Sequence, residues 1–117
     1  MLTTPTDYAN FLIEVIDPKA SDAFRLNQAS LKEMLRPHVK VPNDQVAMSW
    51  ALGWQIFHDG KHDFIAHGGD NEGFHCYAAA STETKSAYVI MTNGENAYDK
   101  VVGKLMTGDI MPRFLLK

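Results

Sequence analysis

The chain has 117 residues, the length of one small domain, and 45% of them are apolar, which is enough for a modest hydrophobic core. Its formal net charge is −3, from 14 acidic and 11 basic residues scattered without long runs, so no basic stripe is available to follow a phosphate backbone and a nucleic-acid partner is not expected. A basic start followed by an apolar stretch is absent, as is any run of about 18 apolar residues, so the sequence predicts neither a signal peptide nor a membrane span and leaves the compartment open.

The first predicted element is a helix over residues 4–16. Thr4 suits the cap position, Pro5 suits the first helical position, and Asp7 favours the positive end of the helix dipole. Apolar residues then recur at helical spacing and give the helix one apolar face: Tyr8, Phe11, Leu12, Val15 and Ile16. Asp17-Pro18 is expected to end the helix.

A second, shorter helix is predicted between Asn27, as its cap, and Pro37, before which it must stop. Leu31, Met34 and Leu35 lie on one stripe of this helix. Residues 37–46 are expected to form a loop.

From Met48 onward, aromatic and branched residues replace the helical pattern, and strands are predicted over residues 50–57, 64–66, 74–81 and 86–92. Asp59-Gly60 is typical of a hairpin between the first two strands. Trp50 and Trp54 should share a face of the first strand and pack in the core; the alternative is that one of them lines a substrate site.

The apolar residues Ala97, Val101, Val102, Leu105 and Met106 fit a last helix, and an apolar tail follows over residues 110–115. The predicted fold class is therefore α+β: one domain, residues 1–117, with an antiparallel sheet of about four strands, two N-terminal helices and one C-terminal helix.

The most unusual stretch is residues 66–74, in which three glycines within six residues lie between two predicted strands. Here the sequence resembles the serine β-lactamase and D-alanyl-D-alanine carboxypeptidase superfamily, in particular its class C-like and esterase-like branch. The segments that match the family's motifs, in the family's order, are residues 2–12, Leu52-Gly53-Trp54, His67-Gly68-Gly69, Gly73-Phe74 and residues 88–94. The resemblance covers nearly the whole chain and implies a partial β-lactamase fold.

The resemblance also implies roles for single residues. His67 would occupy the place of the usual lysine and contact a substrate carboxylate or move a proton, for which an imidazole is suited near neutral pH. The backbone N–H of Asp70 would be one oxyanion-hole donor. Gly68 and Gly69 would keep the strand edge clear so that substrate lies along it, with Asn71 at the end of the binding segment.

The nucleophile of that superfamily is absent, because no Ser-x-x-Lys occurs in the chain. Tyr8-Ala9-Asn10 resembles the family's tyrosine element, but Tyr8 belongs to the apolar stripe of the first helix and we interpret the match as coincidence. The chain is therefore expected to be the C-terminal portion of such a hydrolase, without the N-terminal strands and the nucleophile-bearing helical region. A truncated gene, a cloned domain and a cleaved product are the alternatives.

Two functions remain open. The first is a part of a serine hydrolase that acts on a small-molecule or peptide substrate, such as a β-lactam, a D-amino-acid peptide or an ester, and that is inactive alone. His-Gly-Gly in place of Lys-Thr-Gly favours an esterase or peptidase-like role over antibiotic hydrolysis. The second is a non-catalytic association module. The resemblance implies that strand 86–92 lacks its N-terminal neighbour, so either a homo-oligomer or a complementing N-terminal fragment is expected at that edge.

Other chemistry receives less support from the sequence. A metal site could draw on His58, Asp59, His62, Asp63 and His75, but their spacing fits no metal motif, and a solvated hairpin is the better account. Cys76 beside His75 could suggest a thiol nucleophile, but strand neighbours point to opposite faces, so a buried structural cysteine is expected. The glycine-rich stretch lacks the lysine of a phosphate-binding loop. We expect no metal and no cofactor.

Overall fold

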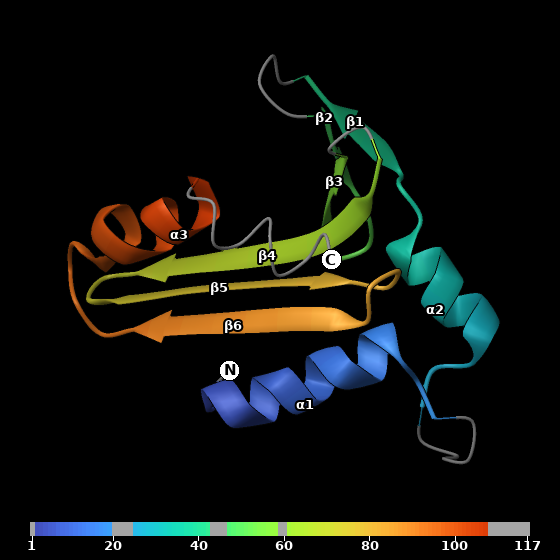
Figure 1. Ribbon diagram of the computed structural model, residues 1–117, viewed down its shortest axis with the longest axis horizontal. Coiled ribbons are helices and arrows are strands. Elements are labelled where there is room, and N and C mark those ends of the chain that lie inside the picture. Colours follow the sequence, from blue (N-terminus) through green and yellow to red (C-terminus); the bar gives the residue numbers. More distant parts are fainter. Residues whose placement is uncertain (1, 20–24, 43–46, 59–60, 108–117) are drawn as a thin grey trace.

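The computed structural model describes residues 2–19, 25–42, 47–58 and 61–107, and these form an α+β structure with one antiparallel sheet (Figure 1). The six strands follow one another in chain order across the sheet: β1 (Val39–Val41), β2 (Ala47–Trp50), β3 (Gln55–His58), β4 (Asp63–Asn71), β5 (Phe74–Ser81) and β6 (Ser86–Thr92). The α+β class and the antiparallel sheet are as predicted. The strand count of about four is wrong.

Two differences in the sheet explain the count. Residues 39–41 pair with β2 instead of lying in a loop. The predicted strand 50–57 is in fact two strands joined by a tight turn, in which the Ala51 N–H donates to the Trp54 carbonyl at 2.8 Å and Gly53 adopts a φ of 81°. Trp50 therefore ends β2, whereas Trp54 lies in the turn just before β3, so the two do not share a strand as predicted. The run 50–54 contains no polar residue and resembles a strand, and only the glycine signals the reversal.

Helix α1 (Pro5–Ile16) begins and ends as predicted. The Thr4 hydroxyl accepts a hydrogen bond from the Asp7 N–H at 3.1 Å and donates to the Asp7 carboxylate at 2.8 Å, which closes a cap around Pro5. At its other end, Lys85 from the β5–β6 turn donates to the Ile16 carbonyl at 3.0 Å and to the Asp17 carboxylate at 2.6 Å. A strand turn thus caps the helix.

The remaining helices also match the predicted segments. In α2 (Gln28–Leu35) the Asn27 side chain accepts from the Ser30 N–H at 2.8 Å, and the helix stops before Pro37. The last helical segment consists of a π-helical turn, η1 (Tyr98–Val102), followed by α3 (Gly103–Thr107). The apolar tail 110–115 and the Asp59-Gly60 signal lie outside the described residues. No described helix is both long and apolar enough to cross a membrane.

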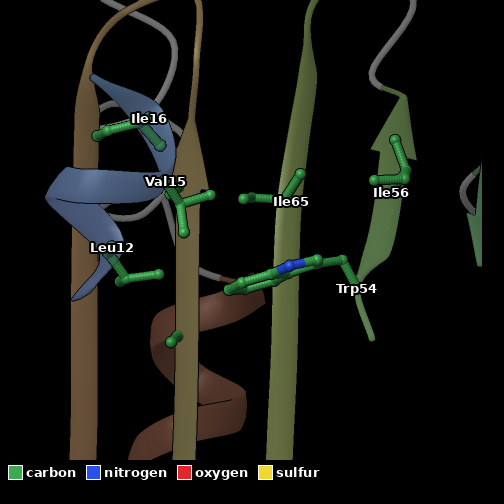
Figure 2. Packing of buried hydrophobic residues seen from close by; sticks show 8 residues of the cluster. Leu12, Val15, Ile16, Trp54, Ile56 and Ile65 are labelled. Atoms are coloured by element: carbon green, nitrogen blue, oxygen red, sulfur yellow. The ribbon is translucent and has the colours of Figure 1, made fainter. Parts of the chain in front are cut away.

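The two faces of the sheet carry separate cores. Helix α1 places Leu12, Val15 and Ile16 against Ile65 and Trp54, which Figure 2 shows at close range. On the opposite face, η1 buries Val102 on a second cluster that contains Ala66, Tyr77 and Ala79. Alternate residues of β4 and β5 therefore contribute to different cores. Consequently, each residue of the glycine-rich stretch can be assigned to a face.

Candidate functional site

Strand β4 continues beyond the point at which its neighbour β3 ends. The last pair between them is Gln55 with Ala66, whereas the pairing of β4 with β5 continues to Asn71 with Phe74. The segment 67–71 therefore belongs to one long strand, and among the described residues it has a strand partner on one side only. This free strand edge, residues 67–71, contains every candidate site residue predicted from the sequence.

The register indicates which backbone groups face the free strand edge. Asn71 and Phe74 flank a two-residue turn, and the pair that flanks such a turn is hydrogen bonded in an antiparallel hairpin. Counting back from Asn71, every second residue directs its N–H and C=O to β5. Gly68 and Asp70 therefore direct theirs to the side that β3 has left, which is the direction an added strand or an oxyanion would require.

His67 is exposed and lies on the α1 face of the sheet, two residues along the strand from Ile65. Its ring packs edge-on against the ring of Trp50, with 6.0 Å between centroids and an interplanar angle of 64°. This contact fixes the imidazole beside the β2–β3 turn. Extending the β3–β4 register by one residue would place Trp54 opposite His67.

A cavity of about 450 Å³ adjoins His67 where β3 leaves the sheet, a volume typical of small-molecule sites. Its lining comes from the start of α1, from the β2–β3 turn and from β4: Thr3, Asp7, Tyr8, Phe11, Gly53, Trp54 and His67. The rings of Tyr8, Phe11 and Trp54 form one wall, with Phe11 stacked on Trp54 at 6.1 Å and Tyr8 edge-on to Phe11 at 5.5 Å. We call these three rings the aromatic wall.

Burial in this wall raises the pKa of the Tyr8 phenol, and the charge of a Cys76 thiolate would raise it further. A phenol is neutral at physiological pH with its ordinary pKa of 10.0, and this shift moves Tyr8 further from ionisation. It can donate or accept a hydrogen bond in the cavity, but its raised pKa makes it a poor source of phenolate.

Asp70 and His67 do not act on one another through their side chains, because the two residues point to opposite faces. The Asp70 carboxylate pairs with Nδ1 of His75, which is buried, and His75 donates from Nε2 to the Glu95 carbonyl at 3.1 Å. Only the backbone of Asp70 is therefore directed to the free strand edge. Asn71 is exposed at the hairpin end.

Gly69 has a structural reason to be glycine that the sequence did not reveal. A Cβ atom at this position would lie 2.9 Å from Sγ of Cys76, its cross-strand partner. At Gly68 the nearest side-chain atom would be Cδ2 of Tyr77 at 3.4 Å. The absence of a side chain at residue 69 thus allows close packing against β5 and also leaves the strand edge accessible.

The expectation of a buried Cys76 is wrong, because this cysteine is exposed on the α1 face. It opposes a glycine, which covers less surface than any other residue. His75 and Cys76 do point to opposite faces, as predicted for strand neighbours.

The other histidines pair with carboxylates in surface contacts. His58 pairs with Asp63, and Nδ1 of His62 lies 2.8 Å from the Glu83 carboxylate. Within the described ranges no three His, Cys, Asp or Glu side chains gather as a metal site would require, and Asp59 lies outside these ranges.

Comparisons of the chain with protein-family models, with curated proteins and with solved structures find no match.

Sequence reasoning missed most of the cavity lining. The sequence indicates Asp7 only as an acidic residue at the positive end of the helix dipole, and Tyr8 and Phe11 only as part of one apolar stripe. The same three residues also line the cavity beside His67. Only the long-range packing of α1 on the sheet brings positions 7 and 67 together.

Proposed function

We propose that this chain forms one wall of the active site of a serine hydrolase related to the β-lactamase and D-alanyl-D-alanine carboxypeptidase superfamily, with the nucleophile supplied by a polypeptide segment that carries Ser-x-x-Lys. The substrate class is a D-amino-acid peptide or a small ester that is hydrolysed through an acyl-enzyme. The observation that carries the proposal is the free strand edge, with His67 and a cavity of small-molecule size beside it.

Each part of the wall has a task in acyl transfer. A substrate lying along residues 67–71 would add a short strand to β4, which orients its scissile carbonyl without any side-chain contact. The Asp70 N–H would donate to the oxygen that becomes negative in the tetrahedral intermediate. His67 would donate to the substrate or pass a proton to the leaving group, because one ring nitrogen of a neutral imidazole donates and the other accepts.

Substrate binding to the isolated chain tests the proposal without the nucleophile. The ligand is N-acetyl-D-alanyl-D-alanine methyl ester, titrated into the ¹⁵N-labelled chain. We expect amide shifts concentrated at residues 67–71, and a loss of affinity of about three- to tenfold in His67→Ala, the value of one or two hydrogen bonds. His62→Ala removes a histidine that does not line the cavity and serves as the matched control.

Two results would contradict the proposal. Shifts that avoid residues 67–71 in a folded chain would rule out the substrate-binding edge. Turnover of a nitrophenyl ester or a chromogenic cephalosporin by the purified chain, lost in His67→Ala, would show that a nucleophile is present in this chain.

A second candidate function is association through β6, and one observation favours it. Strand β6 ends the sheet, and its residues 86–92 include no charged residue and no proline. At the other edge, β1 is short, carries Lys40 and lies between Pro37 and Pro42, which are devices that discourage strand pairing. The outer edge of β6 has no strand neighbour among the described residues, although α1 packs beside this strand (Figure 1). This edge is suited to receive a strand from a second copy of the chain or from a complementing N-terminal fragment.

A further inference from the structure

We infer that the cavity beside His67 takes a cationic amine attached to an apolar or aromatic group, and that it discriminates against carboxylates. This inference rests on the proposed function, since it names the group that a substrate on the free strand edge would place in the cavity. It goes beyond that function by assigning a ligand charge.

The charge of the lining supports a cation. Asp7 carries the one carboxylate among the described lining residues, and neither lysine nor arginine is among them. Thr4 donates to one oxygen of the Asp7 carboxylate, and a carboxylate accepts about four hydrogen bonds, so Asp7 retains capacity for a ligand. An ammonium group beside Asp7 would form a charge-assisted hydrogen bond, whereas a ligand carboxylate would be repelled.

The aromatic wall supports the same ligand. The faces of Tyr8, Phe11 and Trp54 carry the negative part of the ring quadrupole, which attracts a cation within about 6 Å. Phe11 is 47% exposed and Trp54 only 4%, so the wall extends from solvent to the core. An apolar group can therefore stack on the outer rings while its amine approaches Asp7, which lies one turn before Phe11 on α1.

Neutral Tyr8 fits this arrangement. Its raised pKa keeps the phenol uncharged, so it offers a lone pair to an ammonium group without becoming an ionised partner itself. His67, the first residue of the free strand edge, lines the same cavity as the aromatic wall. A substrate with its amine in the cavity would therefore present its adjoining carbonyl to residues 67–71.

Three ligands of one shape and different charge test the inference: benzylamine, benzyl alcohol and benzoate. Each is titrated into the ¹⁵N-labelled chain near neutral pH, with the amides of Asp7, Phe11, Gly53 and His67 as reporters. We expect benzylamine to bind about tenfold more tightly than benzyl alcohol, and benzoate to bind more weakly than either, as one charge-assisted contact would produce.

The variant Asp7→Asn keeps the shape of the side chain and an oxygen that can accept from the Thr4 hydroxyl, but it removes the charge. It should abolish the difference between benzylamine and benzyl alcohol by weakening the binding of benzylamine. Asp63→Asn is the matched control, because this exposed carboxylate lies on the same strand as His67 and pairs with His58 outside the cavity. In that variant the preference for benzylamine should persist.

Benzoate affinity equal to that of benzylamine, or a preference that survives Asp7→Asn, would overturn the inference. These outcomes differ from failure of the proposed function, which is measured by the response of residues 67–71 to an uncharged peptide ester. If the cavity prefers benzylamine but the peptide ester does not shift residues 67–71, the cavity is an amine site and the hydrolase proposal fails alone.

Discussion

Gly69 and Cys76 form a cross-strand pair in which the glycine has no side chain, and this leaves room for the cysteine sulfur. A Cβ atom at residue 69 would lie 2.9 Å from Sγ of Cys76, which is closer than ordinary van der Waals contact. Glycine within a strand is otherwise unfavourable, because it loses more conformational freedom on folding than any other residue. The pair therefore balances backbone entropy against side-chain packing.

A double-mutant cycle tests this balance. Gly69→Ala should lower the free energy of unfolding by about 0.5–1.5 kcal/mol, the cost of pushing the Cys76 side chain away from its preferred rotamer. In the Cys76→Ala background the same change should be neutral or stabilising, because Sγ is the one atom within 4 Å of the added methyl group among the described residues other than its chain neighbours. Urea denaturation of the four proteins measures the cycle. Equal costs in both backgrounds would show that this close contact is not the reason for glycine.

The residues whose role depends on local chain geometry could be predicted from the sequence. Thr4, Pro5 and Asn27 begin their helices as expected, because capping involves neighbours within three residues. Exposure of Cys76 could not be predicted, since it depends on the residue opposite it on another strand. The same holds for Asp7, whose second environment is a cavity built from three separate segments.

At the scale of elements, α1 is held at its C-terminal end by a turn between two strands. Lys85 donates both to a helix carbonyl and to the Asp17 carboxylate, and it adopts a φ of 56°, a conformation uncommon for residues with a side chain. The hydrogen bond from Lys85, followed by its charge, lowers the pKa of Asp17. Formation of α1 and of the β5–β6 hairpin is thereby coupled.

The lowered pKa of Asp17 has a definite sign in stability. A carboxyl with a depressed pKa in the folded state stabilises that state above its usual value of 3.8 and loses this effect as pH falls through the folded pKa. We therefore expect Asp17→Asn to lower Tm at neutral pH, and the gap to wild type to close in acid below the usual pKa. Thermal melts across this range measure it.

A partner deletion provides the control for Asp17. In the Lys85→Met background, Asp17→Asn should change Tm little at any pH, because the group that lowers the pKa has been removed. A gap that persists in acid, or that is unchanged in this background, would assign the effect to helix capping by Asp17 alone.

The elements themselves were more predictable than their pairing. Both N-terminal helices and strands β5 and β6 lie where periodicity placed them, because their apolar faces repeat over seven or more residues. The predicted strand 50–57 was wrong at one glycine, and β1 has only three residues, too few to show a period. Strand β4 continues through Gly68 and Gly69, although glycine has a low strand propensity. Pairing with β5 overrides that low propensity.

At the scale of the whole molecule, Trp54 joins elements that are otherwise separate. It is buried between α1 and the sheet, it stacks on Phe11, and it lines the cavity beside His67. Trp54→Ala should lower the free energy of unfolding by about 3–5 kcal/mol, as loss of a large buried ring does. Leu52→Ala, in the same turn but exposed, is the control and should cost little. Equal losses of stability in the two variants would show that disruption of the turn, and not loss of the buried ring, causes the destabilisation.

Association through β6 is tested by a charge on that strand. Met91 belongs to neither core cluster, so Met91→Lys adds charge at the edge without removing a core residue. If copies of the chain pair through β6, this variant should weaken self-association at least about tenfold, because the two-fold partner would bring a like charge nearby. Analytical ultracentrifugation measures it, with Val41→Lys on β1 as the control. Association that is unchanged in Met91→Lys would place the contact elsewhere.

Cys76 is both the single cysteine of the chain and an exposed one, on the same face of the sheet as His67. A maleimide fluorophore or a nitroxide would therefore attach at one defined position without any substitution elsewhere. Because residue 69 has no side chain to shield the thiol, such a label would sit against the strand that carries the candidate site. The native chain thus offers its own attachment point for watching ligand arrival in real time.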